Sequence, residues 1–360
     1  MTKSFDIAVF EGDGIGPEIM APTVEILKII AAKNDDYELN FKTLPAGAGL
    51  YAETGESLPS DSLQAARDAD AILLSAMGLP SVRYPDGTEI SPQIELRKDM
   101  NLFAGVRPVT VRDGKNCPLK RPNNETIDFV LIRESTEGLF HSMGKGELSA
   151  NEARETLLIT RKVSEKLFDF SFKLASQRKE TGQGSGKVTC VDKANVFRAF
   201  AFFREIFDET ANKYPSIQAD HAYVDATALW MVQKPWSFDV LVTENMFGDI
   251  LSDLGAGLMG GLGLAPSADI GENHAVFQPC HGSAPDIAGQ GIANPYAMIL
   301  SAAMMLDWLG HRNGVERMVL DATSLKNAVN DALGDESSIT GDIDGSGNTR
   351  TASEAVMKRI

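Results

Sequence analysis

Two carboxylates, Asp249 and Asp253, lie four residues apart in a stretch whose apolar residues recur at helical spacing. Residues four apart share one helix face, where like charges repel at a cost of roughly a few tenths of a kcal/mol. The chain from Pro235 to His311 contains no Lys or Arg that would offset this repulsion. Either water screens the pair as part of a solvated acidic face, or a positive group arrives from elsewhere in the molecule or from solution. A hard divalent cation, which prefers oxygen ligands, is the leading candidate for that group. Asp225, which ends another apolar run, is a candidate third ligand.

Three arginines are candidates to bind a substrate that carries several carboxylates. Arg97 and Arg107 flank one short segment, and Arg133 ends the apolar run Phe129–Ile132. A charge at the end of a buried strand needs a partner because its desolvation is costly. Guanidinium groups bind carboxylates through paired hydrogen bonds, so the pattern predicts a di- or tricarboxylate ligand. The alternative is that the three are unrelated surface residues.

Ser91 followed by Pro92 is typical of a helix start. Ser91, Gln93 and Arg97 would then lie near one helix N-terminus, which is a natural anion site. Simple capping of the helix by Ser91 explains the same pattern.

Lys193 comes just after an apolar run that ends at Val191, and a helical pattern follows it. A partly desolvated lysine in such a place is a candidate base with a lowered pKa. The alternative is a lysine that buries only its aliphatic stem and keeps the ammonium group in water.

Two glycine-containing loops are candidates to bind a nucleotide. Cys280–Asp286 combines a histidine, glycine, serine and an acid, and such a loop either seats a ribose diol or is only a loop. Gly12–Pro17 lacks the third glycine of the dinucleotide fingerprint, and Pro17 merely begins a helix. We therefore reject Gly12–Pro17 as a Rossmann dinucleotide-binding motif.

These residues must be positioned by alternating strands and helices. Continuous apolar runs, typical of strands covered on both faces, predict strands over Ile7–Phe10, Ala71–Ser75, Phe129–Ile132, Lys187–Val191 and Val240–Thr243. Helical spacing predicts helices over Pro17–Ala32, Pro92–Met100, Asn151–Gln177, Asn195–Tyr214 and Pro295–Leu309. The fold class that follows is α/β.

Composition limits the class of protein. A chain of 360 residues exceeds the usual size of a single core, so two domains are expected. The net charge of −16 argues against nucleic acid and anionic membrane surfaces as partners. The N-terminal apolar run is too short for a signal peptide or a membrane span. Cys117, Cys190 and Cys280 have no metal-ligand spacing, which favours reduced thiols and a cytoplasmic location.

The chain resembles the isocitrate/isopropylmalate dehydrogenase family, which comprises NAD-dependent β-decarboxylating dehydrogenases of the isopropylmalate, isocitrate, homoisocitrate and tartrate/malate type. The resemblance covers essentially the whole chain. It rests on six segments in order, which are Gly12–Glu18, Leu96–Arg97 through Arg107–Pro108, Ile132–Glu134, Asp192–Asn195, Phe247–Asp253 and His281–Gly289.

The resemblance implies a two-domain α/β fold that is not a Rossmann fold. The terminal domain would comprise residues 1–103 and 260–360 and carry the cofactor loop. The central domain, residues 104–259, would carry a dimerisation arm and the metal and catalytic residues. The implied assembly is a homodimer with shared active sites.

The same resemblance implies roles for the candidate residues. Asp249 and Asp253 would bind Mg²⁺ or Mn²⁺ together with Asp225 of the partner subunit. Lys193 of the partner subunit would assist deprotonation of the substrate's C2 hydroxyl as hydride leaves for the nicotinamide. The residues implied to bind the hydroxy-carboxylate substrate are Ser91, Gln93, Arg97, Arg107 and Arg133.

The implied cofactor is NAD. Asp286 matches the acid that accepts the adenosine ribose hydroxyls, where a 2′-phosphate would be repelled, so NAD is favoured over NADP. The residues implied to line the cofactor site are Gln278, His281, Gly282, Ser283, Ala284, Asp286 and Asn294.

Two positions depart from the family pattern. Phe140 replaces the tyrosine that protonates the enolate, and phenylalanine has no proton to donate. Either His141 or a water takes that role, or protonation is slow, or the reaction stops short of decarboxylation. Gln278 replaces a glutamate near the cofactor, which keeps hydrogen bonds but removes a charge.

The substrate expected from Ser91 and Gln93 is polar-branched, of the isocitrate, homoisocitrate or tartrate kind. Isopropylmalate is the alternative, because Ile94 offers an apolar wall. An alternative of another class is a regulatory or ligand-binding homologue that has lost its proton donor. Retention of Lys193, Asp225 and the acidic pair favours an active oxidoreductase.

Overall fold

A computed structural model describes residues 2–111, 117–120 and 125–360. The chain divides into two compact units. Unit 1 runs to Met100 and resumes over Gly261–Ala268 and Glu272–Ile360, whereas unit 2 comprises Asn101–Gly260 and Asp269–Gly271. The first change of unit therefore falls three residues before the predicted boundary at residue 103. The short return at Asp269–Gly271 has no counterpart in the predicted domains.

Unit 1 contains a sheet with the strand order β2-β1-β3-β12-β11. Strand β1 runs parallel to both β2 and β3, and β12 runs parallel to β3. The strands span β1 Lys3–Phe10, β2 Tyr37–Thr43, β3 Ala71–Leu74, β11 Pro266–Ile270 and β12 Ala275–Pro279. The last residues of β11 belong to unit 2.

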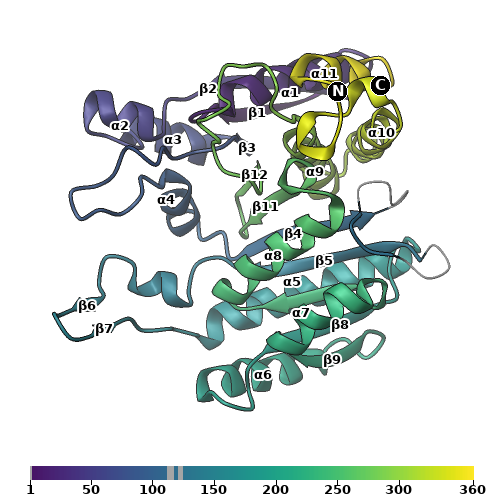
Figure 1. Ribbon diagram of the computed structural model, residues 1–360. Helices are drawn as coiled ribbons and strands as arrows, with labels where there is room; N and C mark the ends of the chain where they lie inside the picture. Colours follow the sequence, from purple (N-terminus) through teal and green to yellow (C-terminus); the bar gives the residue numbers. More distant parts are fainter. Residues whose placement is uncertain (1, 112–116, 121–124) are drawn as a thin grey trace. The chain divides into compact units, whose positions relative to one another are not determined.

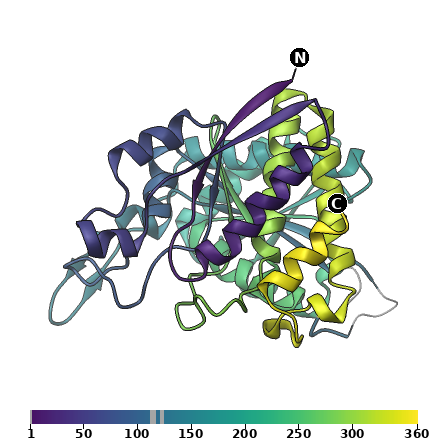
Figure 2. The same cartoon turned by 90° about the horizontal axis from the view of Figure 1, so that it is seen from above.

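Helices cover this sheet. Helix α9 packs against β12 and α10, and α1 packs against α11, as Figures 1 and 2 show for the purple and yellow ends of the chain. The helices span α1 Gly16–Ala31, α2 Ala48–Thr54, α3 Ser60–Asp68, α4 Pro92–Asp99, α9 Tyr296–Asn313, α10 Glu316–Ala332 and α11 Thr349–Met357. Three short 3₁₀ turns are η4 Leu262–Leu264, η5 Glu336–Ser338 and η6 Gly341–Ile343.

Unit 2 contains a sheet with the order β4-β5-β10-β8-β9, in which β4 is antiparallel and the others are parallel. The strands span β4 Ala104–Val111, β5 Ile127–Glu134, β8 Lys187–Asp192, β9 Gln218–Tyr223 and β10 Val240–Thr243. A separate ribbon pairs β6 Glu147–Leu148 with β7 Ala153–Arg154, and it projects from the rest of unit 2 in Figure 1.

The helices of unit 2 form two pairs, α5 with α6 and α7 with α8. They span α5 Arg161–Glu180, α6 Arg198–Ala211, α7 Val224–Gln233 and α8 Asn245–Met259, with the 3₁₀ turns η2 Leu139–Ser142 and η3 Pro235–Ser237. In register, Thr243 of β10 lies opposite both Arg133 of β5 and Val191 of β8. Since these strands are parallel, their carboxyl ends meet at one edge of the sheet, where ligands bind in open α/β sheets.

The five predicted strands are confirmed, and three of them are longer in the structure. All four residues of β3 and all four of β10 are buried, as expected for strands covered on both faces. Of the strands missed by the sequence, β2 and β9 lie at sheet edges and β6 and β7 are two residues long, whereas β4, β11 and β12 are largely buried. Strand β9, for example, exposes five of its six residues and therefore has no continuous apolar run.

The prediction of one helix over Asn151–Gln177 is wrong at its start. Helix α5 begins at Arg161, because the side chain of Thr160 accepts a hydrogen bond from the amide of Val163 and ends the preceding extended segment. Within that segment, Ala153–Arg154 forms β7 by pairing with β6. Strand pairing therefore overrides the helix-forming composition of residues 151–160. The other four predicted helices are present with shifted ends.

Candidate active site

Helix α8 presents the acidic pair on its exposed face. Glu244, at the end of β10, caps the helix by accepting hydrogen bonds from the amides of Met246 (3.1 Å) and Phe247 (2.8 Å). Asp249 and Asp253 are exposed, whereas Leu251 and Ser252 between them are buried. The pair therefore shares a helix face, as the spacing predicts.

Electrostatics favour a cation at this face. Partial burial and then the negative charge of Asp249 raise the pKa of Asp253. A hard divalent ion would offset this repulsion with the oxygen ligands it prefers, so the two residues fit the predicted metal. No group of three or more His, Cys, Asp or Glu that could hold a metal forms within the described part of this chain. The described residues thus supply two of the oxygen ligands that such an ion needs.

Arg133, at the carboxyl end of β5, is brought against this helix. Its guanidinium is buried and forms an ion pair with Asp249 through Nη1. Nε and Nη2 donate to Oδ1 of Asn245 at 3.0 and 2.7 Å. Gly248 permits the close approach, because a Cβ there would lie 2.6 Å from Cβ of Arg133. The ring of Phe140 lies 5.6 Å from the guanidinium carbon.

Arg107 lies in β4, next to β5, and is also buried. Its Nη2 is 3.4 Å from Oδ1 of Asp269, which also accepts a hydrogen bond from Ser135 at 3.2 Å. Asp269 belongs to the short return of the chain into unit 2. Sequence reasoning missed Asp269, because nothing in its local pattern marks it as the partner of an arginine 162 residues away.

Lys193 and Asp225 form an ion pair within one chain, with Nζ 2.7 Å from Oδ1. The hydrogen bond from Lys193 lowers the pKa of Asp225. Lys193 directly follows β8. The last residue of that strand, Asp192, is fully buried, and its carboxylate accepts hydrogen bonds from Nη2 (2.7 Å) and Nε (2.8 Å) of Arg204. Lys193 is thus held at the carboxyl edge of the sheet, half-buried, with its ammonium group beside a carboxylate.

Helix α4 in unit 1 carries Gln93 and Arg97, and Ser91 directly precedes it. Ser91 occupies the predicted N-cap position, but its hydroxyl donates to the carbonyl of Glu89 (3.2 Å) and makes no cap hydrogen bond. Pro92 does begin the helix. Oε1 of Gln93 is buried and has no hydrogen-bond partner.

The loop after β12 holds the predicted cofactor residues. Nδ1 of His281 donates to the carbonyl of Gly282 (2.9 Å), and burial lowers the pKa of the ring, which favours its neutral form. Its Nε2 is buried without a partner and is left as an acceptor. Such an orphaned acceptor fits a ligand that donates a hydrogen bond, as the adenine amino group of NAD can.

The remaining predicted cofactor residues lie on the same loop or close to it in sequence. Asn294 donates to Asp342 at 3.0 Å, a residue that sequence reasoning missed. Ala284 adopts a positive φ of 37°. Gly282 and Asp286 are exposed, whereas Gln278 and Ser283 are buried.

The Gly12–Pro17 segment positions this loop. The amide of Ile15 donates to the carbonyl of Ser283 (2.8 Å), and a Cβ on Gly14 would lie 2.0 Å from the same oxygen. The carboxylate of Asp13 accepts from the amides of Ala48, Gly49 and Gly78. The segment therefore has a structural role, since it holds the loop after β12 through a backbone hydrogen bond. This agrees with the rejection of a Rossmann fingerprint.

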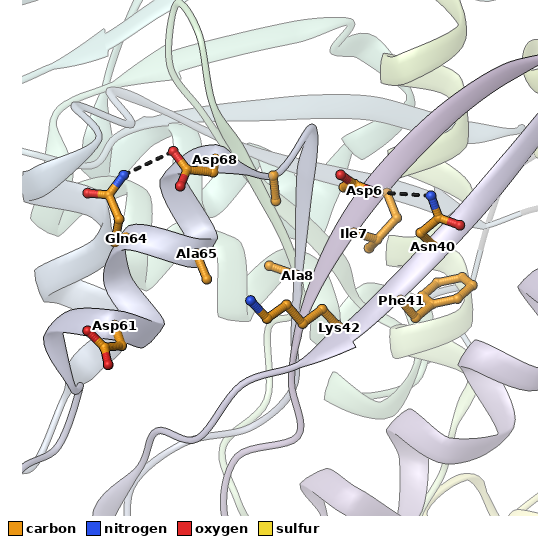
Figure 3. Close-up of a pocket in the computed structure, with 11 residues that line it drawn as sticks. Asp6, Ile7, Ala8, Asn40, Phe41, Lys42, Asp61, Gln64, Ala65 and Asp68 are labelled. Atoms are coloured by element: carbon orange, nitrogen blue, oxygen red, sulfur yellow. Dashed lines mark hydrogen bonds between the residues drawn. The ribbon is translucent and has the colours of Figure 1, made fainter.

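A cavity of about 490 Å³ lies elsewhere in unit 1, between β1, β2 and α3. Figure 3 shows Asp6, Asn40, Lys42, Asp61, Gln64 and Asp68 around it. Asn40 donates to Asp6 and Gln64 donates to Asp68, so two of its three carboxylates are already paired. None of the predicted site residues lines this cavity.

Comparison with known proteins gives one consistent result. The family model for isocitrate/isopropylmalate dehydrogenase matches residues 6–358. The chain is 41% identical over 355 residues to a 3-isopropylmalate/3-methylmalate dehydrogenase of Methanocaldococcus jannaschii, covering 98% of each chain. It is 40% identical to a 3-isopropylmalate dehydrogenase of Streptococcus mutans, covering 98% of this chain and 99% of the relative.

Solved structures are similar over the same length. An isocitrate dehydrogenase from Methylococcus capsulatus is 35% identical with a TM-score of 0.82, covering 99% of each chain. A β-decarboxylating dehydrogenase from Thermococcus kodakarensis is 32% identical with a TM-score of 0.78, covering 99% of this chain and 96% of that one. Among the described helices, none is long and apolar enough to cross a membrane.

Proposed function

Because the chain belongs to the isocitrate/isopropylmalate dehydrogenase family of NAD-dependent, β-decarboxylating oxidoreductases, we propose that its substrate is a 3-alkylmalate, with 3-isopropylmalate as the first candidate. The observation that supports this choice is the 41% identity, over 98% of both chains, to an enzyme named for 3-isopropylmalate and 3-methylmalate. The relatives thus favour the alkyl-branched alternative over the polar-branched substrate expected from Ser91 and Gln93.

In the proposed reaction Arg97, Arg107 and Arg133 bind the carboxylates of the malate part. The buried environment of Arg107 and Arg133 strengthens these contacts, because charge-assisted hydrogen bonds gain energy where water is excluded. Asp269 and Asp249 are the carboxylate partners of the Arg107 and Arg133 guanidinium groups.

Lys193 and Asp225 handle the proton in this proposal. Asp225 stays ionised because its pKa is lowered by Lys193, and the pair fixes the direction of the Lys193 Nζ. Lys193 assists deprotonation of the C2 hydroxyl as hydride leaves the same carbon: its ammonium group first gives a proton to water, and the neutral amine then accepts the hydroxyl proton. Asp249 and Asp253 would hold Mg²⁺ or Mn²⁺, and His281, Asp286 and Asn294 would bind NAD. When bound, the cation stabilises negative charge on the substrate oxygens and NAD accepts the hydride.

The substrate assignment is tested by NAD reduction with Mn²⁺ on 3-isopropylmalate, isocitrate, homoisocitrate, tartrate and malate. We expect kcat/KM for 3-isopropylmalate to exceed that for isocitrate by at least about tenfold, the usual worth of apolar complementarity. The opposite order would overturn the proposal.

A polar-branched substrate is the second candidate, and one observation favours it. The amide of Gln93 has a buried oxygen without a partner, and leaving such a group unsatisfied is costly. Gln93→Leu separates the two candidates. It should raise activity on 3-isopropylmalate if the branch is alkyl, and abolish activity on isocitrate if the branch is a carboxylate.

A further inference from the structure

The guanidinium of Arg133 is held by a neutral amide on one side. Oδ1 of Asn245 accepts two hydrogen bonds from it, from Nε at 3.0 Å and Nη2 at 2.7 Å. Both residues are buried, with 1% of Asn245 and 4% of Arg133 exposed. Asn245 is the first residue of α8, which begins directly after β10 and its capping residue Glu244.

The orientation of the Asn245 amide is fixed by its partners. Guanidinium nitrogens are donors only, so the oxygen of the amide must face Arg133. The amide nitrogen Nδ2 donates to the backbone carbonyl of Glu137 at 3.2 Å. Asn245 thus links β5, the segment that follows β5, and the start of α8 with three hydrogen bonds.

The contacts of Arg133 with α8 differ in charge. One helical turn after Asn245, Asp249 pairs with Nη1 through a carboxylate whose side chain is 58% exposed. Asn245 supplies direction without charge, whereas Asp249 supplies charge from a position open to solvent. A carboxylate at residue 245 would keep the acceptor oxygen and place a second, buried negative charge on the same guanidinium.

We propose that Asn245 is a positioning residue for substrate recognition, whose neutral amide orients the Arg133 guanidinium without cancelling the positive charge that attracts a substrate carboxylate. This inference rests on the proposed function, in which Arg133 binds the substrate. Arg133 thus has a neutral acceptor at its buried side and a carboxylate, Asp249, only at its solvent-exposed side.

The matched pair Asn245→Asp and Asn245→Ser tests charge against shape. Asn245→Asp keeps an acceptor oxygen and adds a charge, so we expect the Kd of 3-isopropylmalate, measured by calorimetry with Mn²⁺ and without NAD, to rise at least about tenfold. Asn245→Ser keeps a neutral acceptor, so its Kd should rise several-fold less. The KM for NAD should change less than about twofold in both variants, because only the carboxylate site is altered.

Asn34→Asp is the control, since Asn34 also accepts hydrogen bonds from its surroundings, at the amides of Asp36 and Tyr37, in a turn of unit 1. It should leave the Kd unchanged. Equal Kd values for wild type and Asn245→Asp would overturn the inference about Asn245 but not the proposed function. An equal rise in Kd for Asn245→Asp and Asn245→Ser would also overturn it, even if both variants lose thermal stability, because the charge at residue 245 would then be irrelevant. Absence of binding by the wild-type protein would overturn the proposed function with it.

Discussion

At the residue scale, the site contrasts groups that are charged and buried with groups that are charged and exposed. Arg107 and Arg133 are buried, and each has a carboxylate partner. Asp249, Asp253 and Asp225 are exposed at the ends or outer faces of helices. Buried cations can recognise a carboxylate strongly. Asp249 and Asp225 are paired with Arg133 and Lys193, and exposed carboxylates of this kind can exchange those partners for a metal ion.

The sequence predicted the charged members of this site but not the residues that orient them. Spacing alone indicated that Asp249 and Asp253 share a helix face, and the end of an apolar run indicated Arg133 and Lys193. Asn245 and Asp269 were missed, because an amide or acid at the end of an element has no pattern that reveals a distant partner. The assigned roles stay predictions.

Phe140→Tyr tests the loss of the family's proton donor. The ring already lies 5.6 Å from the Arg133 guanidinium, and the substitution adds only a hydroxyl to it. If donor loss limits the reaction, CO₂ release relative to NADH formation should rise, and the rate of CO₂ release should gain about tenfold or more. Phe41→Tyr in β2 is the control. Equal CO₂ yields before and after the exchange would mean that His141 or water already donates the proton.

The stability of the protein should depend on the protonation of Glu134 near neutral pH. Its carboxylate is buried, and burial raises its pKa to about 7 from an ordinary 4.5, although Thr136 and Glu137 donate hydrogen bonds that lower it. Because the pKa of Glu134 is higher in the folded than in the unfolded state, the contribution of Glu134 to stability is complete below about pH 4.5. It is lost as pH rises through about 7.

Glu134→Gln should remove that dependence. The free energy of unfolding of wild type, relative to the variant, should fall by about 3 kcal/mol between about pH 4.5 and about pH 7.5. Any hydrogen bond lost by the amide would add a constant offset only. Denaturant titrations at several pH values measure the free energies of unfolding of wild type and Glu134→Gln. If the two free energies changed with pH in parallel, the raised pKa of Glu134 would be contradicted.

At the element scale, strand ends and helix starts position the chemistry. The parallel strands β5, β8 and β10 end at one edge, and Arg133, Lys193 and Asn245 lie at or just after these ends. Continuous apolar runs predicted these strands because both faces are covered. The false start of α5 and the missed edge strands have one cause, since strand pairing between distant segments is absent from local periodicity.

Helix α4 is anchored at its last turn by a contact that the sequence did not reveal. Arg67 of α3 pairs with both carboxylate oxygens of Asp99, through Nε at 2.7 Å and through Nη2. Since α4 carries Gln93 and Arg97, the pair fixes the helix that presents them.

Arg67→Ala should therefore raise the KM for the hydroxy acid by about threefold to tenfold, while stability changes little, because exposed ion pairs contribute little. Arg350→Ala, which breaks the exposed pair with Glu354 on α11, is the control and should leave KM unchanged. Steady-state kinetics measure both. An unaltered KM for Arg67→Ala would show that α4 needs no such anchor.

At the scale of the whole molecule, we propose a homodimer with shared sites. Several apolar side chains on α7 and α8 are exposed, including Leu229 (53%), Val232 (47%) and Ile250 (63%). Exposed apolar residues gathered on neighbouring helices are typical of a protein interface. Burial of this face against a second copy would place the proposed metal residues near an interface, which fits the absence of a third ligand in the described chain.

Mixing two inactive variants tests this arrangement. In a mixed dimer of Lys193→Ala and Asp249→Ala, shared sites leave one site with both residues intact, whereas sites made from one chain leave none. We expect co-expression to restore up to about half the wild-type activity per mixed dimer. Mixtures that remain as inactive as the separate variants would favour sites within single chains.

The metal-dependent oxidation and decarboxylation is tested most directly by the yield of NADH and CO₂ from 3-isopropylmalate as Mn²⁺ is titrated, for wild type and Asp249→Asn. We expect wild type to form NADH only with the metal, to release CO₂ from the same substrate, and to lose both with a chelator. Asp249→Asn should need at least about tenfold more Mn²⁺. An unchanged metal requirement in Asp249→Asn, or NADH formation by wild type in the chelator, would contradict this metal dependence.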